Sequence, residues 1–222
     1  MKRFLTLIVV LLATATIAHA QFGIVGGFTL SNTSVKNWEA ASTKNMSQFH
    51  AGIAYKIKLG PLFALQPQLT YEAKGATVQE IASGGGSQTV LTSLKTNGGF
   101  VELGVGAQLG IDLLAFRPFI LAQPFVGYQV YGKENLEALS VSSDDLNAYM
   151  AAAKNKLEWG FGVGGGVELL NHLQLSIQWF MNIGQMYNSD KLDADALMSV
   201  VVSNYKKLQN YQGVKFTLGV FF

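Results

Sequence analysis

The chain has 222 residues, of which 49% are hydrophobic and only 14% are charged, whereas an average soluble domain has about 25% charged residues. Its formal net charge of +2 falls to about zero without Lys2 and Arg3, so the basic footprint of a nucleic-acid-binding protein is absent. The sequence has no cysteine, which excludes disulfides, thiolate metal sites and lipidation of a cysteine.

The amino terminus has the three parts of a secretory signal peptide. Lys2 and Arg3 form the positive region, residues 4–17 are mostly apolar, and Ala18-His19-Ala20 has the small-residue pattern of a cleavage site. The apolar stretch is shorter than the roughly 20 residues of an ordinary spanning helix. We therefore expect residues 1–20 to be removed after Ala20 and residues 21–222 to form one barrel domain; an uncleaved anchor is the alternative.

Eight segments alternate apolar residues with small or polar ones at a period of two, which indicates β-strands with two different faces. Each is near or above the roughly 9 to 11 residues that a tilted membrane-spanning strand needs. Beyond the amino terminus no apolar run suits a spanning helix, so a membrane protein of this composition crosses with strands. The predicted strands are residues 22–31, 48–59, 63–75, 100–111, 117–132, 157–169, 173–183 and 211–222.

The last predicted strand shows the pattern most clearly, with an apolar row that ends on the terminal residue of the chain. A terminal aromatic residue on such a strand favours a closed outer-membrane barrel. The same row resembles the carboxyl-terminal signal by which the barrel-assembly machinery recognises its substrates. We interpret as this assembly signal the residues Val214, Phe216, Leu218, Val220 and Phe222.

The predicted connections alternate in length, as short periplasmic turns and long extracellular loops do in outer-membrane barrels. The turns are residues 60–61, 112–115 and 170–172, and the loops are residues 32–47, 76–97, 133–156 and 184–210. Helix-start signals at Ser143 and Ser189 predict short helices in two loops. The prediction is an all-β, eight-stranded antiparallel up-and-down transmembrane barrel in the outer membrane of a Gram-negative cell. A soluble sandwich also alternates, but its strands are shorter.

Two prolines interrupt this pattern. Pro67 and Pro124 fall within predicted strands, where each removes a hydrogen bond of the ladder, so we expect a β-bulge at both.

Three segments resemble a known family. They are residues 65–76 (LQPQLTYEAKGA), 117–134 (RPFILAQPFVGYQVYGKE) and 160–169 (GFGVGGGVEL), and they look like the PorT-like outer-membrane β-barrel family of Bacteroidota, a branch of the porin family. The family's strand prolines match Pro67, Pro118 and Pro124. The resemblance covers essentially residues 22–222 and implies location better than activity, since its motifs are structural and one branch is linked to secretion across the outer membrane.

The barrel interior receives the polar face of each strand, and with eight strands it is just wide enough for side chains to fill. Buried charges must pair, since an unpaired one costs several kcal/mol. We therefore expect an ion-pair plug in the lumen, with a proton or ion path as the alternative. The predicted network consists of Lys56, Lys58, Glu72, Lys74, Glu102, Arg117, Glu158, Glu168 and Lys215.

No catalytic, cofactor or metal site is expected. Beyond the amino terminus the only histidines are His50 and His172, and neither has a serine and a carboxylate at a recognisable spacing. Asp190, Asp193 and Asp195 lack the spacing of a calcium loop and more simply charge a helix start. The aromatic residues expected at the membrane interfaces are Trp38, Trp159, Trp179, Tyr55, Tyr71 and Tyr128.

Three functions remain open from the sequence. The first is a structural or interaction barrel whose long loops meet an extracellular or secretion-complex partner, and the long loops favour it. The second is a narrow channel for ions or small solutes, and the third is an outer-membrane lipid-modifying enzyme. The expected partners are outer-membrane lipids, the barrel-assembly machinery and a protein at the loops, with no nucleic acid.

Overall fold

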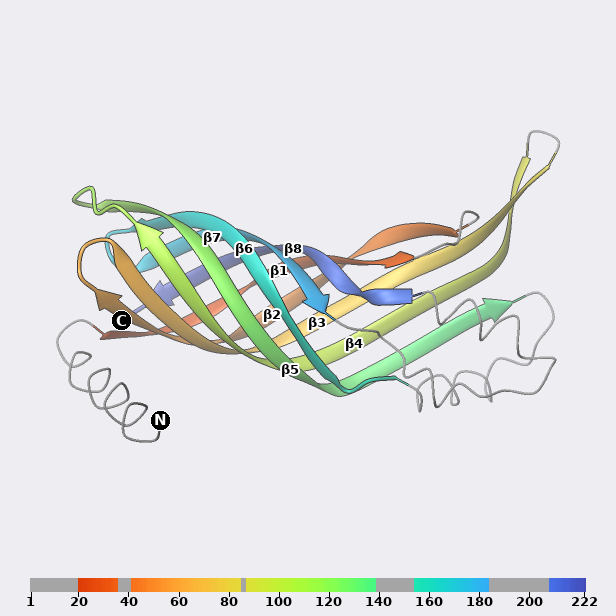
Figure 1. Ribbon diagram of the computed structural model, residues 1–222, viewed down its shortest axis with the longest axis horizontal. Helices are drawn as coiled ribbons and strands as arrows, with labels where there is room; N and C mark the ends of the chain where they lie inside the picture. The colour runs from red at the N-terminus through yellow and green to blue at the C-terminus, as the bar shows by residue number, and fades with distance from the viewer. Residues whose placement is uncertain (1–19, 36–40, 85–86, 139–153, 184–207) are drawn as a thin grey trace, which may run out of the picture.

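The computed structural model describes residues 20–35, 41–84, 87–138, 154–183 and 208–222. In this part of the chain eight antiparallel strands follow one another round a closed barrel, and the last pairs with the first (Figure 1). The predicted all-β barrel is confirmed. The strands are β1 (Ala20–Val35), β2 (Ala41–Leu59), β3 (Phe63–Gly84), β4 (Ser87–Gly110), β5 (Phe116–Ala138), β6 (Leu157–Leu169), β7 (Leu173–Ile183) and β8 (Leu208–Phe221).

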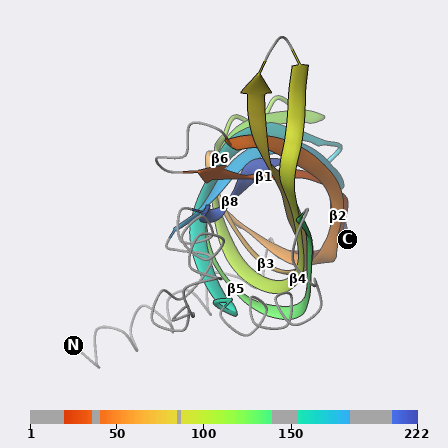
Figure 2. The same ribbon diagram turned by 90° about the vertical axis from the view of Figure 1, so that its right-hand side faces the viewer.

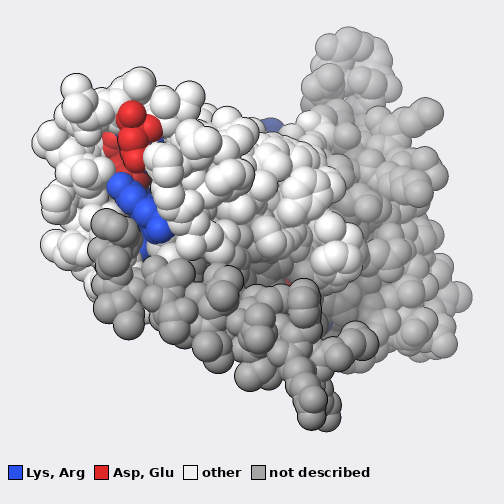
Figure 3. Space-filling model, turned by 60° about the vertical axis from the view of Figure 1, so that its left-hand side comes forward, with Lys and Arg blue, Asp and Glu red and all other residues white. Residues whose placement is uncertain are grey.

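Apolar side chains cover the outside of the barrel, and polar ones point inward. Along β4 every second residue from Val101 to Leu109 is exposed, and the residues between them are buried. A strand with a period of two presents one face to each side of a closed wall, so this inside-out pattern suits a lipid surround. Between the two ends, the visible wall is almost free of charge (Figure 3). Among the described residues no helix is long and apolar enough to span a membrane.

The two ends of the barrel differ. At the short-turn end β1 begins, β8 ends and tight turns join β2 to β3, β4 to β5 and β6 to β7. At the projecting end several strands continue well beyond the barrel, and the β3–β4 hairpin reaches furthest (Figures 1 and 2). β3 has 22 residues and β4 has 24, and they pair from Phe63 and Leu109 to Gly84 and Ser87.

The prediction that residues 32–47 and 76–97 are loops is therefore wrong over most of their length, and the predicted loop 133–156 is wrong over residues 133–138. β2 starts at Ala41, β5 continues to Ala138, and the stretch from Ala76 to Gly84 is a strand. Threonine, valine and isoleucine there favour strands, and the partner strand satisfies the backbone. Beyond a lipid layer no face has to be apolar, so the alternation that identified the other strands is weak here. The predicted helices lie almost wholly outside the described residues, as does Trp38.

The expected bulges at Pro67 and Pro124 are also wrong. The register on either side of each proline is unchanged, with Pro67 opposite Val105 and Pro124 opposite Phe161. The ladder on the other side of each strand omits pairs at the proline and resumes in the same register. A missing N–H removes a bond without requiring an extra residue, so proline is accommodated by a gap. A register shift occurs instead between Gly99 and Phe100.

Glycine allows β1 and β8 to approach closely where the barrel closes. A Cβ on Gly27, which faces inward, would overlap the carbonyl oxygen of Phe216. A Cβ on its neighbour Gly26, which faces outward, would find its nearest atom 3.3 Å away, at the carbonyl oxygen of His50. The closure is completed at the short-turn end, where Phe221 is fully buried against Val25 and Ala54. Gly27 is thus required by the backbone, whereas Gly26 is not.

Candidate functional site

In the described part of the eight strands, the inner face carries nine charged side chains, and all are those that the alternation of the sequence places there. Eight are almost fully buried, and Lys58 is partly exposed. They form salt bridges in two clusters. The short-turn cluster consists of Lys56, Lys58, Arg117 and Glu168 with Asp112, and the central cluster consists of Glu72, Lys74, Glu102, Glu158 and Lys215.

Glu168 is the centre of the short-turn cluster. Its Oε2 lies 3.1 Å from Lys56 Nζ and 3.5 Å from Arg117 Nη1, and its Oε1 lies 2.9 Å from Lys58 Nζ. Asp112 Oδ1 lies 3.4 Å from Arg117 Nε. Asp112 was not among the residues predicted to form this network, because it belongs to a turn and not to an alternating strand. With three cations around it, Glu168 keeps a partner if any one of them is removed.

Amide side chains fill the lumen beside this cluster. Arg117 Nη1 donates to Gln108 Oε1 at 3.1 Å, and Gln108 Nε2 donates to Gln66 Oε1 at 2.7 Å. Further along, Gln178 Nε2 donates to Gln123 Oε1 at 3.0 Å. These bonds join different strands, so the glutamines cross-link the wall and occupy the interior between the charged layers.

In the central cluster, acids and bases alternate in one line across the lumen. Lys74 Nζ contacts a carboxylate oxygen of Glu102 and lies 2.8 Å from Glu158 Oε1. Lys215 Nζ lies 3.2 Å from Glu102 Oε2 and 3.0 Å from Glu72 Oε1. The order is therefore Glu158, Lys74, Glu102, Lys215 and Glu72, and the residues come from four strands. A solute crossing the lumen would have to break this line.

Aromatic rings surround Lys74, whose side chain is fully buried. Its ammonium lies 4.8 Å from the centroid of the Phe125 ring, 5.0 Å from that of Phe180 and 5.4 Å from that of Phe100. It also donates to Asn182 Oδ1 at 3.3 Å. Cation–π contacts stabilise a desolvated ammonium most, so the rings both fill the lumen and favour the charged form.

His50 lies at the edge of the central cluster and is buried. Its Nδ1 lies 3.0 Å from Thr29 Oγ1, and its Nε2 lies 3.0 Å from Thr217 Oγ1. The Thr29 hydroxyl also donates to Glu72 Oε2 at 3.5 Å. These partners were not predicted, since threonines 21 and 167 positions away from His50 give no local motif. Both ring nitrogens are occupied inside the packed lumen, so the set holds strands together and does not present a nucleophile to a substrate.

Three side chains meet across the projecting mouth of the barrel. Thr96 Oγ1 on β4 and the Tyr211 hydroxyl on β8 are 2.8 Å apart, and these strands lie on opposite sides of the closed ring. Lys154 Nζ, from the segment before β6, donates to Thr96 Oγ1 at 2.9 Å and to the Tyr211 hydroxyl at 3.2 Å. No sequence signal identified this layer. It lies beyond the central cluster, with the Phe100 ring 6.0 Å from that of Tyr211.

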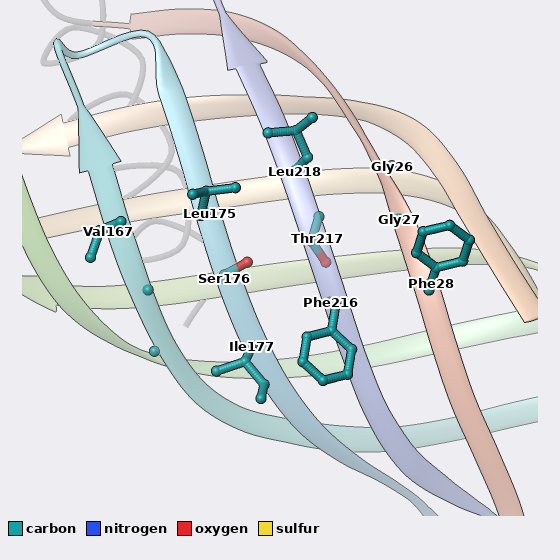
Figure 4. Close-up of a pocket in the computed structure, with 12 residues that line it drawn as sticks. Gly26, Gly27, Phe28, Val167, Leu175, Ser176, Ile177, Phe216, Thr217 and Leu218 are labelled. Atoms are coloured by element: carbon teal, nitrogen blue, oxygen red, sulfur yellow. The ribbon is translucent and has the colours of Figure 1, made fainter. Parts of the chain in front are cut away.

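An apolar groove of about 620 Å³ crosses β6, β7, β8 and β1 on the outer wall (Figure 4). Gly26 and Gly165 leave room between larger neighbours such as Ile177, Phe216 and Leu218. The groove lies on the apolar face and its lining carries no charge, so its shape suits a hydrocarbon chain and offers no acid or base for catalysis.

The predicted carboxyl-terminal row lies on the outer face of β8. Phe216, Leu218, Val220 and Phe222 are exposed, and Val214 is partly exposed. Phe222 N donates to Phe22 O at 2.8 Å, so the terminal residue also takes part in closing the barrel.

The other candidate residues are not brought together with the clusters. His172 is exposed in its turn, with Nδ1 2.6 Å from Leu170 O. Asp190, Asp193 and Asp195 lie outside the described residues. Within the part of the chain that is described, no group of three or more histidine or acidic side chains is placed to hold a metal ion.

Comparison with known proteins gives one family and several solved structures. The family described as "Outer membrane protein beta-barrel domain" matches residues 15–188, well over half of the chain. No curated protein matches. Neisserial surface protein A is 13% identical with a TM-score of 0.44, over 91% of this chain and 97% of that one. Ail of Yersinia pestis is 9% identical (TM-score 0.40, 91% and 98%), and OprG of Pseudomonas aeruginosa is 12% identical (0.40, 91% and 96%).

Proposed function

This chain belongs to the outer-membrane protein β-barrel domain family, and we propose that it acts there as a closed barrel whose projecting sheet binds a partner protein. In outer-membrane barrels the short turns face the periplasm and the long connections face outward. The projecting end is then extracellular, and the short-turn end is periplasmic.

The observation that carries this proposal is the length of β3 and β4. A spanning strand needs roughly 9 to 11 residues, but these two have 22 and 24. About half of each strand therefore continues beyond the membrane as a paired ribbon. It is flanked at its base by β2, with Ala41 opposite Glu80, and by β5, with Ala138 opposite Thr92. An extended sheet of this kind offers backbone edges and a broad face to a partner.

The packed lumen favours an interaction role over a narrow channel. Three groups of side chains cross the interior: the central cluster, the hydrogen-bonded glutamines, and Thr96, Lys154 and Tyr211 at the mouth. Breaking a buried ion pair costs about 3 to 5 kcal/mol. A static plug of this kind stabilises the wall and obstructs solutes. Since the described histidines lack an accessible nucleophile, we also propose that the protein is not a lipid-modifying enzyme.

We further propose that the chain belongs to the PorT-like family of Bacteroidota, which residues 65–76, 117–134 and 160–169 resemble, and that its extracellular partner is part of a secretion complex. Residues 1–20 are a signal peptide removed after Ala20. The outward row of β8 from Val214 to Phe222 is recognised by the barrel-assembly machinery, because that strand must pair with β1 to remove both sheet edges.

The test compares the full chain with a variant that lacks the ribbon. Residues 80–92 are replaced by Asn-Gly between Gln79 and Ser93, which are cross-strand partners and suit a two-residue turn. Both proteins are cross-linked in intact cells, extracted in detergent and checked for the heat-dependent gel shift of a folded barrel. We expect the full chain to co-purify with a specific protein that the folded variant does not capture.

Identical captured proteins from both chains would contradict the proposal. Stable single-channel currents from the purified full chain in planar bilayers would favour the narrow channel instead.

A further inference from the structure

All three periplasmic turns contain leucine, although turns that face water normally carry polar residues. Four of these leucines are exposed, and we call them the leucine rim. Its members are Leu62 at 46% exposure, Leu113 at 53%, Leu114 at 102% and Leu170 at 70%. A small patch of acidic and basic side chains is visible at the same end of the barrel (Figure 3).

The backbone gives no reason for leucine at these positions. Leu114 has φ 61° and Leu170 has φ 52°, in the left-handed region that favours glycine and asparagine. Asn171, the second central residue of the same turn, shows the expected choice, with φ 61°. At positions 114 and 170, leucine is disfavoured both by the left-handed backbone and by the exposure of its apolar side chain to water. Its presence there indicates that the side chain contacts another apolar surface.

The three turns form one platform. Gly110 N donates to Leu62 O at 2.8 Å, which joins the β2–β3 turn to the end of β4. Leu170 N donates to Ala115 O at 2.7 Å, which joins the β6–β7 turn to the β4–β5 turn. The leucines are therefore held in fixed relative positions by the barrel, and little conformational entropy is lost when they bind.

The position of the leucine rim along the membrane normal indicates which layer of the bilayer it contacts. A strand rise of about 3.3 Å and a tilt of about 40° give roughly 2.5 Å of membrane thickness per residue. The ten steps from the exposed Trp159 to Leu169 on β6 then span about 25 Å, which is the whole apolar band of an outer-membrane barrel. Leu170 begins directly below that band. The same count on β4 runs from Val101, opposite Tyr128, to Ile111, with Leu113 and Leu114 just beyond. Leu62 is bonded to Gly110 and lies at the lower edge of the band.

The rim thus lies in the headgroup layer, which is about 5 to 7 Å thick on each side of a bilayer. A soluble periplasmic protein would reach only surfaces that extend past this layer. We propose that the leucine rim is an interfacial anchor that inserts into the headgroup–acyl boundary of the periplasmic leaflet and sets the depth of the barrel. The ion pair of Asp112 and Arg117 at the same end of the barrel remains at the aqueous mouth. This inference is independent of the extracellular partner.

The absence of cysteine from the sequence makes a direct test possible. The variants L114C and L170C are labelled with an environment-sensitive fluorophore and folded into dioleoylphosphatidylcholine vesicles, with K44C on the extracellular part of β2 as the water-exposed control. We expect blue-shifted emission at both leucine positions, strong quenching by brominated lipid and weak quenching by iodide. Emission that matches K44C, with iodide quenching and no effect of brominated lipid, would overturn the proposal and place the rim in water.

A second variant separates anchoring from turn structure. L114N/L170N keeps the left-handed backbone, which asparagine suits better than leucine, so a purely structural role predicts equal or higher stability. Anchoring predicts a lower urea midpoint of unfolding in vesicles. An unchanged or raised midpoint would overturn the proposal.

Discussion

Replacing Lys74 by methionine removes the cation that joins two carboxylates of the central cluster. Methionine preserves most of the side-chain volume, so the change acts mainly on charge. In the variant Glu102 still has Lys215 Nζ at 3.2 Å, but Glu158 loses its salt bridge to Lys74 and keeps the hydrogen bond that Asn182 donates to its Oε2. Since the side chains of Lys74 and Glu158 are 0% and 3% exposed, water does not replace the lost partner.

The magnitude follows from this geometry. Breaking a buried ion pair by removing one partner costs about 3 to 5 kcal/mol, because it leaves an uncompensated charge. Replacing both partners by neutral groups is often close to neutral. We therefore expect K74M to lower the free energy of unfolding by about 3 to 5 kcal/mol, and K74M/E158Q to recover most of that loss.

The matched control is K58M in the short-turn cluster. Lys58 also pairs with a glutamate, but its side chain is 19% exposed and Glu168 keeps Lys56 at 3.1 Å and Arg117 at 3.5 Å. A partly exposed pair with remaining cations contributes about 0 to 1 kcal/mol. The same chemical change at two lumen lysines should thus differ several-fold in its effect.

The assay is reversible urea unfolding in lipid vesicles, followed by tryptophan fluorescence and by the heat-dependent gel shift. The reasoning fails if K74M costs no more than K58M, since burial would then not govern the pairs. It also fails if E158Q does not rescue K74M, because the loss would then reflect packing and not a stranded carboxylate.

Three further predictions test other parts of the structure. F221A should lower the free energy of unfolding in vesicles by about 3 to 5 kcal/mol, because Phe221 is a fully buried aromatic residue. F222A should change that free energy by no more than about 1 kcal/mol but reduce the yield of inserted barrel in cells. Equal losses of stability would mean that the end of β8 has been assigned to the wrong faces. G27A should abolish the heat-modifiable form while G26A retains it, and a folded G27A barrel would show that the two strands can separate. Intact mass of the purified outer-membrane protein should begin at Gln21, and a retained Met1 would refute cleavage.

The sequence alone determined the strands that cross the membrane and the face that each residue occupies. Lipid outside and a packed polar lumen inside impose a period of two on every spanning strand. The alternation in β4 or β8 therefore shows directly which residues face the lipid and which face the lumen. For the same reason, all nine charged lumen residues were located by counting alternate positions. The short turns after β2, β4 and β6 were also found, because connections of three to five residues leave little freedom in length.

The tertiary structure alone decided how these residues combine. Strand order, tilt and register determine that Lys74 meets Glu102 and Glu158 and that Thr96 meets Tyr211 across the mouth, and none of these pairs is close in sequence. The extension of β3 and β4 was missed because strands that leave the membrane no longer need an apolar face. The leucine rim was not recognised for a related reason: single leucines in three separate turns form one surface only when barrel closure brings those turns to the same height.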